Sequence, residues 1–156
     1  MKLINRDQIA DVVQVNKAAG KTLVFTNGCF DIIHAGHVRY LAEARKLGDC
    51  LIVGLNSDRS VRELKGSTRP VNHQEDRAEV MAALAVVDYV VIFDERTAEY
   101  LVSEIKPDIY VKGGDYCIED IPEAKIVAHN GGKTVLVPEV PGRSSSNIIK
   151  KISERT

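Results

Sequence analysis

Short apolar runs alternate with amphipathic stretches along most of the chain. The runs are rich in β-branched and aromatic residues and show no regular polar alternation, which is typical of strands buried on both faces of a parallel sheet. Five such runs are strand candidates, at residues 22–26, 50–55, 89–93, 109–111 and 134–137. Each is followed by turn-forming residues, so each strand ends before the next helix begins.

The stretches between the runs carry apolar residues at helical spacing and therefore predict helices. Helices are expected at 5–19, at 36–47, from a cap at 56–58, at 72–85, at 97–106, from Pro122 and from about 146. The segment Asn72–Glu75 has the pattern of a capping box, and Thr97 is a candidate cap. Alternating strands and helices predict an α/β fold: a Rossmann-like, doubly wound parallel five-stranded sheet with helices on both faces.

Bulk properties narrow the class of protein. The chain has 156 residues, 44% hydrophobic and 28% charged, and a formal net charge of −1. We expect one domain over 1–156, with an N-terminal helix at 1–20 and a catalytic core at 21–152. The charge favours neither nucleic acid nor an anionic membrane as a partner. No apolar stretch approaches the roughly 20 residues that span a bilayer.

Three cysteines, an odd number with no CxxC pair, indicate reduced thiols rather than disulfides or zinc ligands. The N-terminus lacks the apolar run of a signal peptide. Together these features predict a cytoplasmic protein.

The most informative polar segment follows the first predicted strand, Asn27–His37. In open sheets of this class, ligands bind beyond the carboxyl ends of the strands. The segment places His34 and His37 three apart around a glycine at a helix start, where free N–H groups favour anions. Local capping or packing of the two histidines is the alternative. A two-histidine metal site would need a further ligand, and none stands at a suitable spacing.

These residues carry a family resemblance. Gly28-Cys29-Phe30-Asp31 followed by His34-Ala35-Gly36-His37 resembles the signature of the cytidylyltransferase-like nucleotidyltransferases. The resemblance implies that His34 and His37 contact the phosphates of an NTP and stabilise the pentavalent α-phosphate. A second signature, a hydroxyl-rich turn opening the last helix, stands here as Ser144–Ser146. Its hydroxyl and N–H groups suit the β- and γ-phosphates, although a plain helix cap is the alternative reading.

A narrower likeness covers about residues 20–152. The segments FTNGCFDIIHAGHVRYL, LNSD, KG..RPVN, VKGGDY and SSSNIIKKI resemble the heptose 1-phosphate adenylyltransferases of lipopolysaccharide-precursor synthesis, in their stand-alone form. The likeness implies transfer of AMP from ATP to a heptose 1-phosphate, with Mg²⁺ carried by the ATP. A glycerol-3-phosphate cytidylyltransferase, or a relative with another phosphorylated acceptor, is the alternative. A nucleotide-sensing domain and a synthetase fragment are rivals of other classes.

The site residues follow from these motifs. The predicted catalytic residues are His34, His37 and Lys112. Contacts to ATP are predicted for Thr26, Asn27, Gly28, Cys29, Phe30, Gly36, Arg45, Asn56, Gly113, Gly114, Asp115, Ser144, Ser145 and Ser146. Arg69 and Arg77 are candidates for the acceptor's phosphate or for a dimer contact.

Several of these assignments have local alternatives. Arg45 suits the helix dipole where it stands, and Asn56 suits a helix cap. Asp31 is predicted to hold the turn rather than a metal, and no metal ligands are predicted. The expected partners are ATP and a sugar 1-phosphate, with neither nucleic acid nor membrane, in a homodimer.

Overall fold

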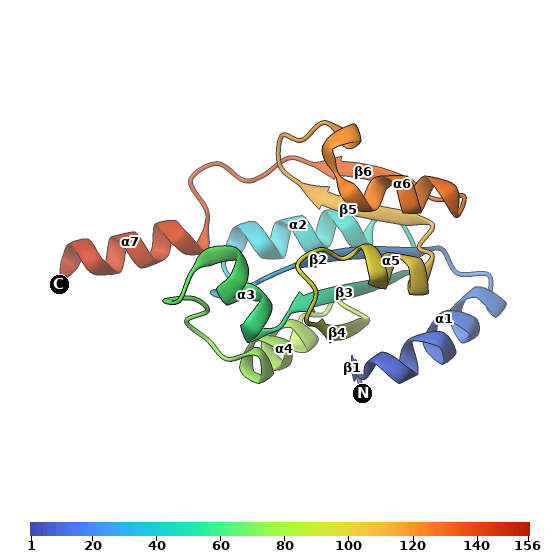
Figure 1. The fold of residues 1–156 in the computed structure, drawn as a ribbon, viewed down its shortest axis with the longest axis horizontal. Coiled ribbons are helices and arrows are strands. Elements are labelled where there is room, and N and C mark those ends of the chain that lie inside the picture. Colours follow the sequence, from blue (N-terminus) through green and yellow to red (C-terminus); the bar gives the residue numbers. More distant parts are fainter.

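The computed structural model describes all residues 1–156 and shows one sheet with helices on both faces (Figure 1). The strands are β1 Leu3–Ile4, β2 Leu23–Gly28, β3 Cys50–Asn56, β4 Tyr89–Phe93, β5 Ile109–Gly113 and β6 Lys133–Val137. The α-helices are α1 Ile9–Ala18, α2 Ala35–Arg45, α3 Asp58–Lys65, α4 Gln74–Ala83, α5 Glu99–Ile105, α6 Pro122–His129 and α7 Ser145–Arg155. Short 3-10 helices lie at η1 Arg6–Gln8 and η2 Ile118–Asp120.

The sheet is entirely parallel, in the order β1-β4-β3-β2-β5-β6. The predicted α/β class is therefore confirmed, but the predicted number of strands is wrong because the sheet has six. The additional strand is β1, which pairs with β4 through Leu3 opposite Val90. Two residues are too few to show any periodicity, and their pairing partner lies far along the chain.

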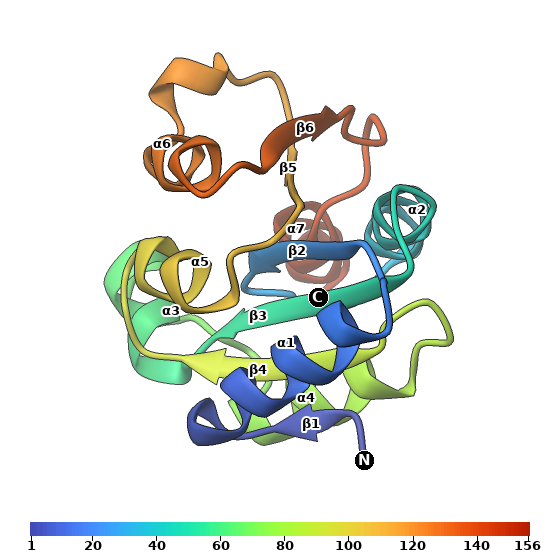
Figure 2. The same ribbon diagram turned by 90° about the vertical axis from the view of Figure 1, so that its right-hand side faces the viewer.

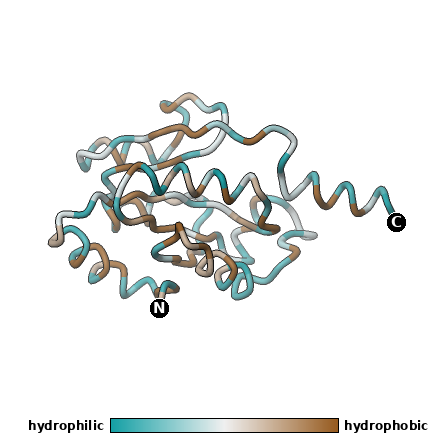
Figure 3. Tube along the Cα trace, turned by 180° about the vertical axis from the view of Figure 1, so that it is seen from behind, coloured by the Kyte–Doolittle hydropathy of each residue, from teal (hydrophilic) through white to brown (hydrophobic).

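The two faces of the sheet are covered by different helices. Alternate residues of β2 point to opposite faces, so Leu23 and Phe25 pack in a core with α1, α5 and α6. Val24 packs in a second core with α2 and α4. Figure 2 shows the helices on either side of the stacked strands. In Figure 3 many of the apolar positions fall on the central segments, with polar positions at the turns.

Three helix starts test the predicted caps. Ser57 caps α3, its hydroxyl accepting from the N–H of Ser60 at 3.2 Å. The predicted capping box at 72–75 does not form: α4 begins at Gln74 without a side-chain cap. The Asn72 side chain instead donates to the carbonyl of Asp31 at 2.9 Å, which ties this segment to the turn after β2.

The predicted cap of α5 also differs from the structure. The cap residue is Ala98, not Thr97, and Ala98 donates its N–H to the buried carboxylate of Glu123 at 2.9 Å. This donor group is thus satisfied from α6, a contact that local sequence does not reveal. None of the helices combines the length and the apolar character that are needed to span a bilayer.

Candidate active site

A cavity of about 650 Å³ opens at the carboxyl ends of the strands. Its walls come from the ends of β2 and β5, the starts of α2 and α7, the end of α3 and the loops before α5 and α6. The cavity brings together fourteen of the residues predicted from sequence: Asn27, Gly28, Cys29, Phe30, His34, Gly36, His37, Asn56, Arg69, Lys112, Gly113, Ser144, Ser145 and Ser146.

The two histidines form a stacked pair at the start of α2. Their ring centroids lie 3.9 Å apart with 28° between the planes, and Phe30 packs edge-on against His37 at 5.2 Å. His34 caps the helix, its Nδ1 accepting from the N–H of Gly36 at 3.1 Å. His34 Nε2 and His37 Nδ1 are buried without a hydrogen-bond partner. Buried polar atoms of this kind are costly unless a ligand satisfies them.

Both imidazoles are neutral near pH 7. Burial, together with the neighbouring His34 and Lys65, lowers the pKa of His37 to about 4. Burial and the nearby Arg143 also lower the pKa of His34. All these causes disfavour the positively charged form of the imidazole. A bound anion would act in the opposite direction and favour protonation.

Close packing around the pair requires a glycine at position 36. A Cβ there would lie 2.8 Å from His34 Cε1 and 3.2 Å from Arg143 Cβ. Phe30 adopts a left-handed backbone conformation, with φ of 46°. Such conformations are uncommon for large residues and tend to occur at functional turns. The turn after β2 is therefore shaped to place its side chains, at a cost in local strain.

The start of α7 forms the facing wall. Ser144 caps this helix, accepting from the N–H of Asn147 at 3.0 Å. The buried Ser145 hydroxyl donates to the carbonyl of Ile32 at 2.9 Å, which fastens α7 to the histidine turn. Two helix N-termini thus face one cavity, an arrangement that suits several phosphate groups.

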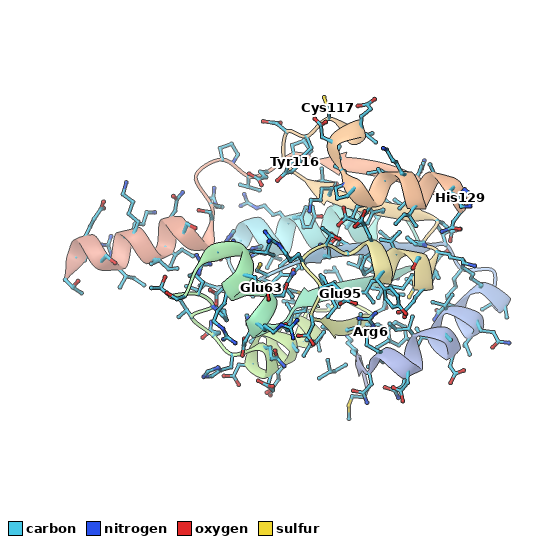
Figure 4. All side chains as sticks on the ribbon, viewed as in Figure 1. Arg6, Glu63, Glu95, Tyr116, Cys117 and His129 are labelled. Atoms are coloured by element: carbon cyan, nitrogen blue, oxygen red, sulfur yellow. The ribbon has the colours of Figure 1, made fainter.

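Residues at the ends of β2, β3 and β5 supply further donors. The buried Tyr110 hydroxyl donates to Asn27 Oδ1 at 2.5 Å, which leaves the Asn27 amide nitrogen for a ligand. Asn56 donates to the Ser60 hydroxyl at 2.9 Å, so its amide nitrogen is engaged with α3. The Lys112 ammonium lies 5.9 Å from the ring centroid of Tyr116. Figure 4 shows Tyr116 on the loop beyond β5.

Arg69 and Asp31 form an ion pair at the cavity wall, with Nε and Oδ2 2.8 Å apart. Burial opposes ionisation of Asp31, but the N–H groups of Asn72 and Val71 together with Arg69 hold its pKa below the ordinary value. Asp31 thus holds the turn, as predicted. Arg69 Nη2 is buried without a partner and remains available to an anionic ligand.

Two predicted arginines do not line the cavity. Arg77 is 1% exposed and donates to the carbonyls of Asn72, Cys29 and Asn56 and to the carboxylate of Asp58. Its guanidinium donates to four backbone and side-chain oxygens. Arg77 is therefore not positioned to bind the phosphate of the predicted acceptor substrate.

Arg45 belongs to the opposite edge of the sheet. It pairs with Asp88 at 3.1 Å and donates to the carbonyl of Gly48. The predicted contact with the triphosphate is therefore not supported by its position, and its role as a helix-end cation fits better.

Three further predicted contacts lie outside the cavity lining. Thr26 is buried and donates to the carbonyl of Val111 at 2.8 Å. Gly114 adopts φ of 107° and packs against the Tyr116 ring, and Asp115 follows it. Two of the residues predicted at the end of β5, Gly114 and Asp115, therefore do not line the cavity.

The cavity also contains cations that the sequence reading missed. They are Lys65, Arg96 and Arg143. Arg143 directly precedes Ser144–Ser146, and this position could have marked it as a cation of the site. Lys65 ends α3 and is the first residue of the segment KG..RPVN, whereas Arg96 carries no local signal.

Metal-binding side chains are not gathered anywhere in the chain: no group of three or more His, Cys, Asp or Glu residues could hold an ion. The donor set of the cavity is instead cationic and N–H-rich, which suits phosphate oxygens.

Comparison with known proteins agrees with the family resemblance of the histidine motif. The family model described as cytidylyltransferase-like matches residues 25–151. The bifunctional protein HldE of Syntrophotalea carbinolica is 50% identical over 154 residues, covering 99% of this chain and 31% of the relative. HldE of Geotalea uraniireducens is 52% identical over 151 residues, covering 97% and 31%. The chain thus spans about a third of the length of these curated relatives.

A solved structure shares the fold. It is the lipopolysaccharide core biosynthesis protein from Thermoplasma volcanium, with a TM-score of 0.64 and 31% sequence identity. The match covers 78% of this chain and 98% of that one.

Proposed function

The chain belongs to the cytidylyltransferase-like family of nucleotidyltransferases, and on that premise we propose that it transfers AMP from ATP to a heptose 1-phosphate. One observation carries the proposal. Unpartnered nitrogens belong to His34 and His37, which line a cavity that the N-terminus of α7 also lines. The matches to HldE and to a lipopolysaccharide biosynthesis protein support a sugar phosphate as the acceptor.

The reaction is an in-line displacement at the α-phosphorus of ATP. An oxygen of the sugar phosphate attacks, a new P–O bond forms, and the bond to the β-phosphate oxygen breaks to release pyrophosphate. A phosphate monoester is largely ionised near neutral pH, with a second pKa of about 6, so the nucleophile needs no general base. This agrees with a cavity rich in donors.

The protein's task in this scheme is to position and stabilise charge. The stacked histidines stabilise the charge that develops on the α-phosphate, and Ser144 and Ser146 bind the β- and γ-phosphates. Lys112 binds phosphate from the end of β5. Arg69, with one free nitrogen at the cavity wall, binds the acceptor's phosphate. Mg²⁺ accompanies the ATP as part of the substrate.

Pyrophosphate release tests the proposal. The purified protein is given ATP or CTP with either heptose 1-phosphate or glycerol 3-phosphate, and kcat/KM is measured for all four pairs. ATP with the heptose should be the best pair, because a cleft built for several sugar hydroxyls leaves polar groups unpaired around a three-carbon acceptor. If CTP with glycerol 3-phosphate is better, the chain is a cytidylyltransferase of the same family.

A further inference from the structure

Strands β2 and β5 run side by side for only part of their length. Their register holds two residue pairs, Val24 with Ile109 and Phe25 with Tyr110. Beyond these pairs, β2 continues beside β3, and β5 continues beside β6. Figure 2 shows β5 and β6 turned away from the stack of the other strands. The residues that follow the separation, at both strand ends, line the cavity, as is usual where the order of strands in an open sheet reverses.

Side-chain hydroxyls replace the backbone pairing where it stops. The next residues along the two strands are Thr26 and Val111, and the hydroxyl of the fully buried Thr26 donates to the Val111 carbonyl at 2.8 Å. The hydroxyl of Tyr40, from α2, lies 2.6 Å from Thr26 Oγ1 and 3.1 Å from the same carbonyl oxygen. Each hydroxyl has one proton, so Tyr40 donates and the Thr26 oxygen accepts. A carbonyl that the separating strands would leave without a partner is therefore satisfied.

The Tyr40 side chain is fixed by packing as well as by these hydrogen bonds. A Cβ at Gly113 would lie 3.1 Å from Tyr40 Cε2, so the ring packs directly on the end of β5. Burial raises the pKa of Tyr40 to about 12, although its hydrogen bond with Thr26 acts in the opposite direction. The hydroxyl therefore keeps its proton at neutral pH and is poorly suited to proton transfer. These features indicate a side chain that holds its neighbours in position.

The link between Thr26 and Tyr40 joins three walls of the cavity. Thr26 precedes Asn27 at the end of β2, and Val111 precedes Lys112 at the end of β5; Asn27 and Lys112 both line the cavity. Tyr40 belongs to α2, the helix that begins at the histidine pair. Because a side chain rather than a backbone N–H makes the bond, the strand ends are held further apart than in a regular sheet, whose strands lie about 4.7–4.9 Å apart.

We propose that Thr26 and Tyr40 are positioning residues: their hydroxyls hold β5 at a fixed distance from β2 and so set the separation of Lys112 from the histidine pair. A nucleotide that spans the crevice contacts groups on both sides at once only when that separation is correct. A misplacement of about 1 Å in such a site can cost about 100-fold in rate. The effect on turnover rests on the proposed function, whereas the effect on the affinity for ATP requires only that the cavity binds ATP.

Removing one hydroxyl at a time tests the link. Thr26→Val, which keeps the shape of the side chain, and separately Tyr40→Phe should lower kcat/KM for pyrophosphate release about 10–100-fold. Thr26→Ser retains the hydroxyl and should keep most of the wild-type activity. Tyr100→Phe is the matched control, because Tyr100 is 57% exposed on α5, and its activity should be unchanged. Far-UV circular dichroism and urea unfolding confirm that each variant is folded at the assay temperature.

A double-mutant cycle with Lys112→Ala separates positioning from a general weakening of the fold. Calorimetric titration with ATP, without an acceptor, gives the affinities. Thr26→Val should weaken ATP binding about tenfold beside the native Lys112 and less than about twofold beside Lys112→Ala, because the hydroxyl acts through Lys112. An equal loss in both backgrounds would overturn the proposal, since it would reflect damage to the fold alone. So would near-normal affinity and turnover of Thr26→Val and Tyr40→Phe, or a Thr26→Ser variant as impaired as Thr26→Val.

Failure of the proposed function has a different signature. A wild type that binds ATP but releases no pyrophosphate with any of the four substrate pairs would contradict the proposed function. The cycle on ATP affinity would still decide whether Thr26 and Tyr40 act through Lys112.

Discussion

The two edges of the sheet differ in how their polar side chains are paired. At the amino edge, an aspartate stands directly before each of three strands and accepts an N–H from a neighbouring segment. Asp49 accepts from Thr22 at 2.9 Å, Asp88 from Leu51 at 2.7 Å, and Asp108 from Leu23 at 2.8 Å. At the carboxyl edge, two imidazole nitrogens and one guanidinium nitrogen are buried without partners.

The difference separates structural from functional polar groups. A satisfied hydrogen bond contributes about 0.5–1.5 kcal/mol, whereas an unsatisfied buried group costs about 1–3 kcal/mol. The amino edge therefore stabilises the fold, and the carboxyl edge retains unpaired groups that a ligand can satisfy. Position along the strand suggests the site, but the state of the hydrogen bonds decides which residues belong to it.

The largest expected effect comes from Arg77, which lies near the carboxyl edge but is fully paired. Arg77→Met should lower the free energy of unfolding by about 3–5 kcal/mol, because it leaves Asp58 and three carbonyls without their donor. Urea unfolding measures this, with Arg59→Met, an exposed ion-pair arginine on α3, as the control. If Arg77→Met has normal stability and loses only the binding of the sugar phosphate, then Arg77 binds the acceptor's phosphate, as first predicted from sequence.

Next in size is the effect of His37, an unpaired residue of the carboxyl edge. His37→Ala should reduce kcat on the order of 10²–10³-fold, as is typical for loss of one preorganised donor at a transition state. The variant should still fold, because His37 Nδ1 makes no hydrogen bond that would be lost. Steady-state kinetics decide the matter, and the control is His129→Ala at the exposed end of α6 (Figure 4). Near-normal turnover of His37→Ala would remove it from the mechanism.

A smaller effect concerns pH. The pKa of His37 is about 4 in the folded protein and about 6.5 in the unfolded chain, so the unfolded chain binds more protons between these values. Stability from this group is complete above about pH 6.5 and is lost as the pH falls toward 4. Relative to His37→Asn, the wild type should lose stability between about pH 7.5 and pH 5. A difference that is equal at both pH values would contradict the lowered pKa.

The smallest expected effect is at the amino edge. Arg45→Ala should leave kcat and the KM for ATP unchanged and cost no more than about 1 kcal/mol, because its ion pair with Asp88 is 35% exposed on both sides. Urea unfolding and steady-state kinetics give both values. A tenfold rise in the KM for ATP would show that Arg45 leaves Asp88 and contacts a phosphate of the bound ATP.

Local patterns were sufficient for much of the fold. Continuous apolar runs identified the five longer strands, and the ends of β2 and β5 pointed to most of the cavity. The predictions failed where the deciding partner was distant in sequence. β1 depends on β4, the cap of α5 on Glu123 in α6, and the position of Arg45 on Asp88.

The same limit applies to the cations of the site. An arginine near a motif gives no sign of whether its guanidinium is already occupied, so Arg77 looked as available as Arg69. Only the three-dimensional list of acceptors distinguishes them: four for Arg77, and a single carboxylate for Arg69, with Nη2 left over. The sequence could therefore locate the edge but not separate its ligand-binding cations from its structural ones.

The hydrogen bond from the Gly36 N–H to His34 Nδ1 also determines which ring nitrogen of His34 carries the proton. An amide N–H can donate only to a ring nitrogen that carries a lone pair, so neutral His34 is held as the Nε2–H tautomer. The side chain therefore presents a fixed donor, without having to gain a charge, at the atom that lacks a partner. Any side chain at position 36 would crowd the ring, so the glycine selects the tautomer as well as allowing the turn. Nitrogen NMR shifts of His34 should report that tautomer in the wild type and a mixture once the amide is displaced.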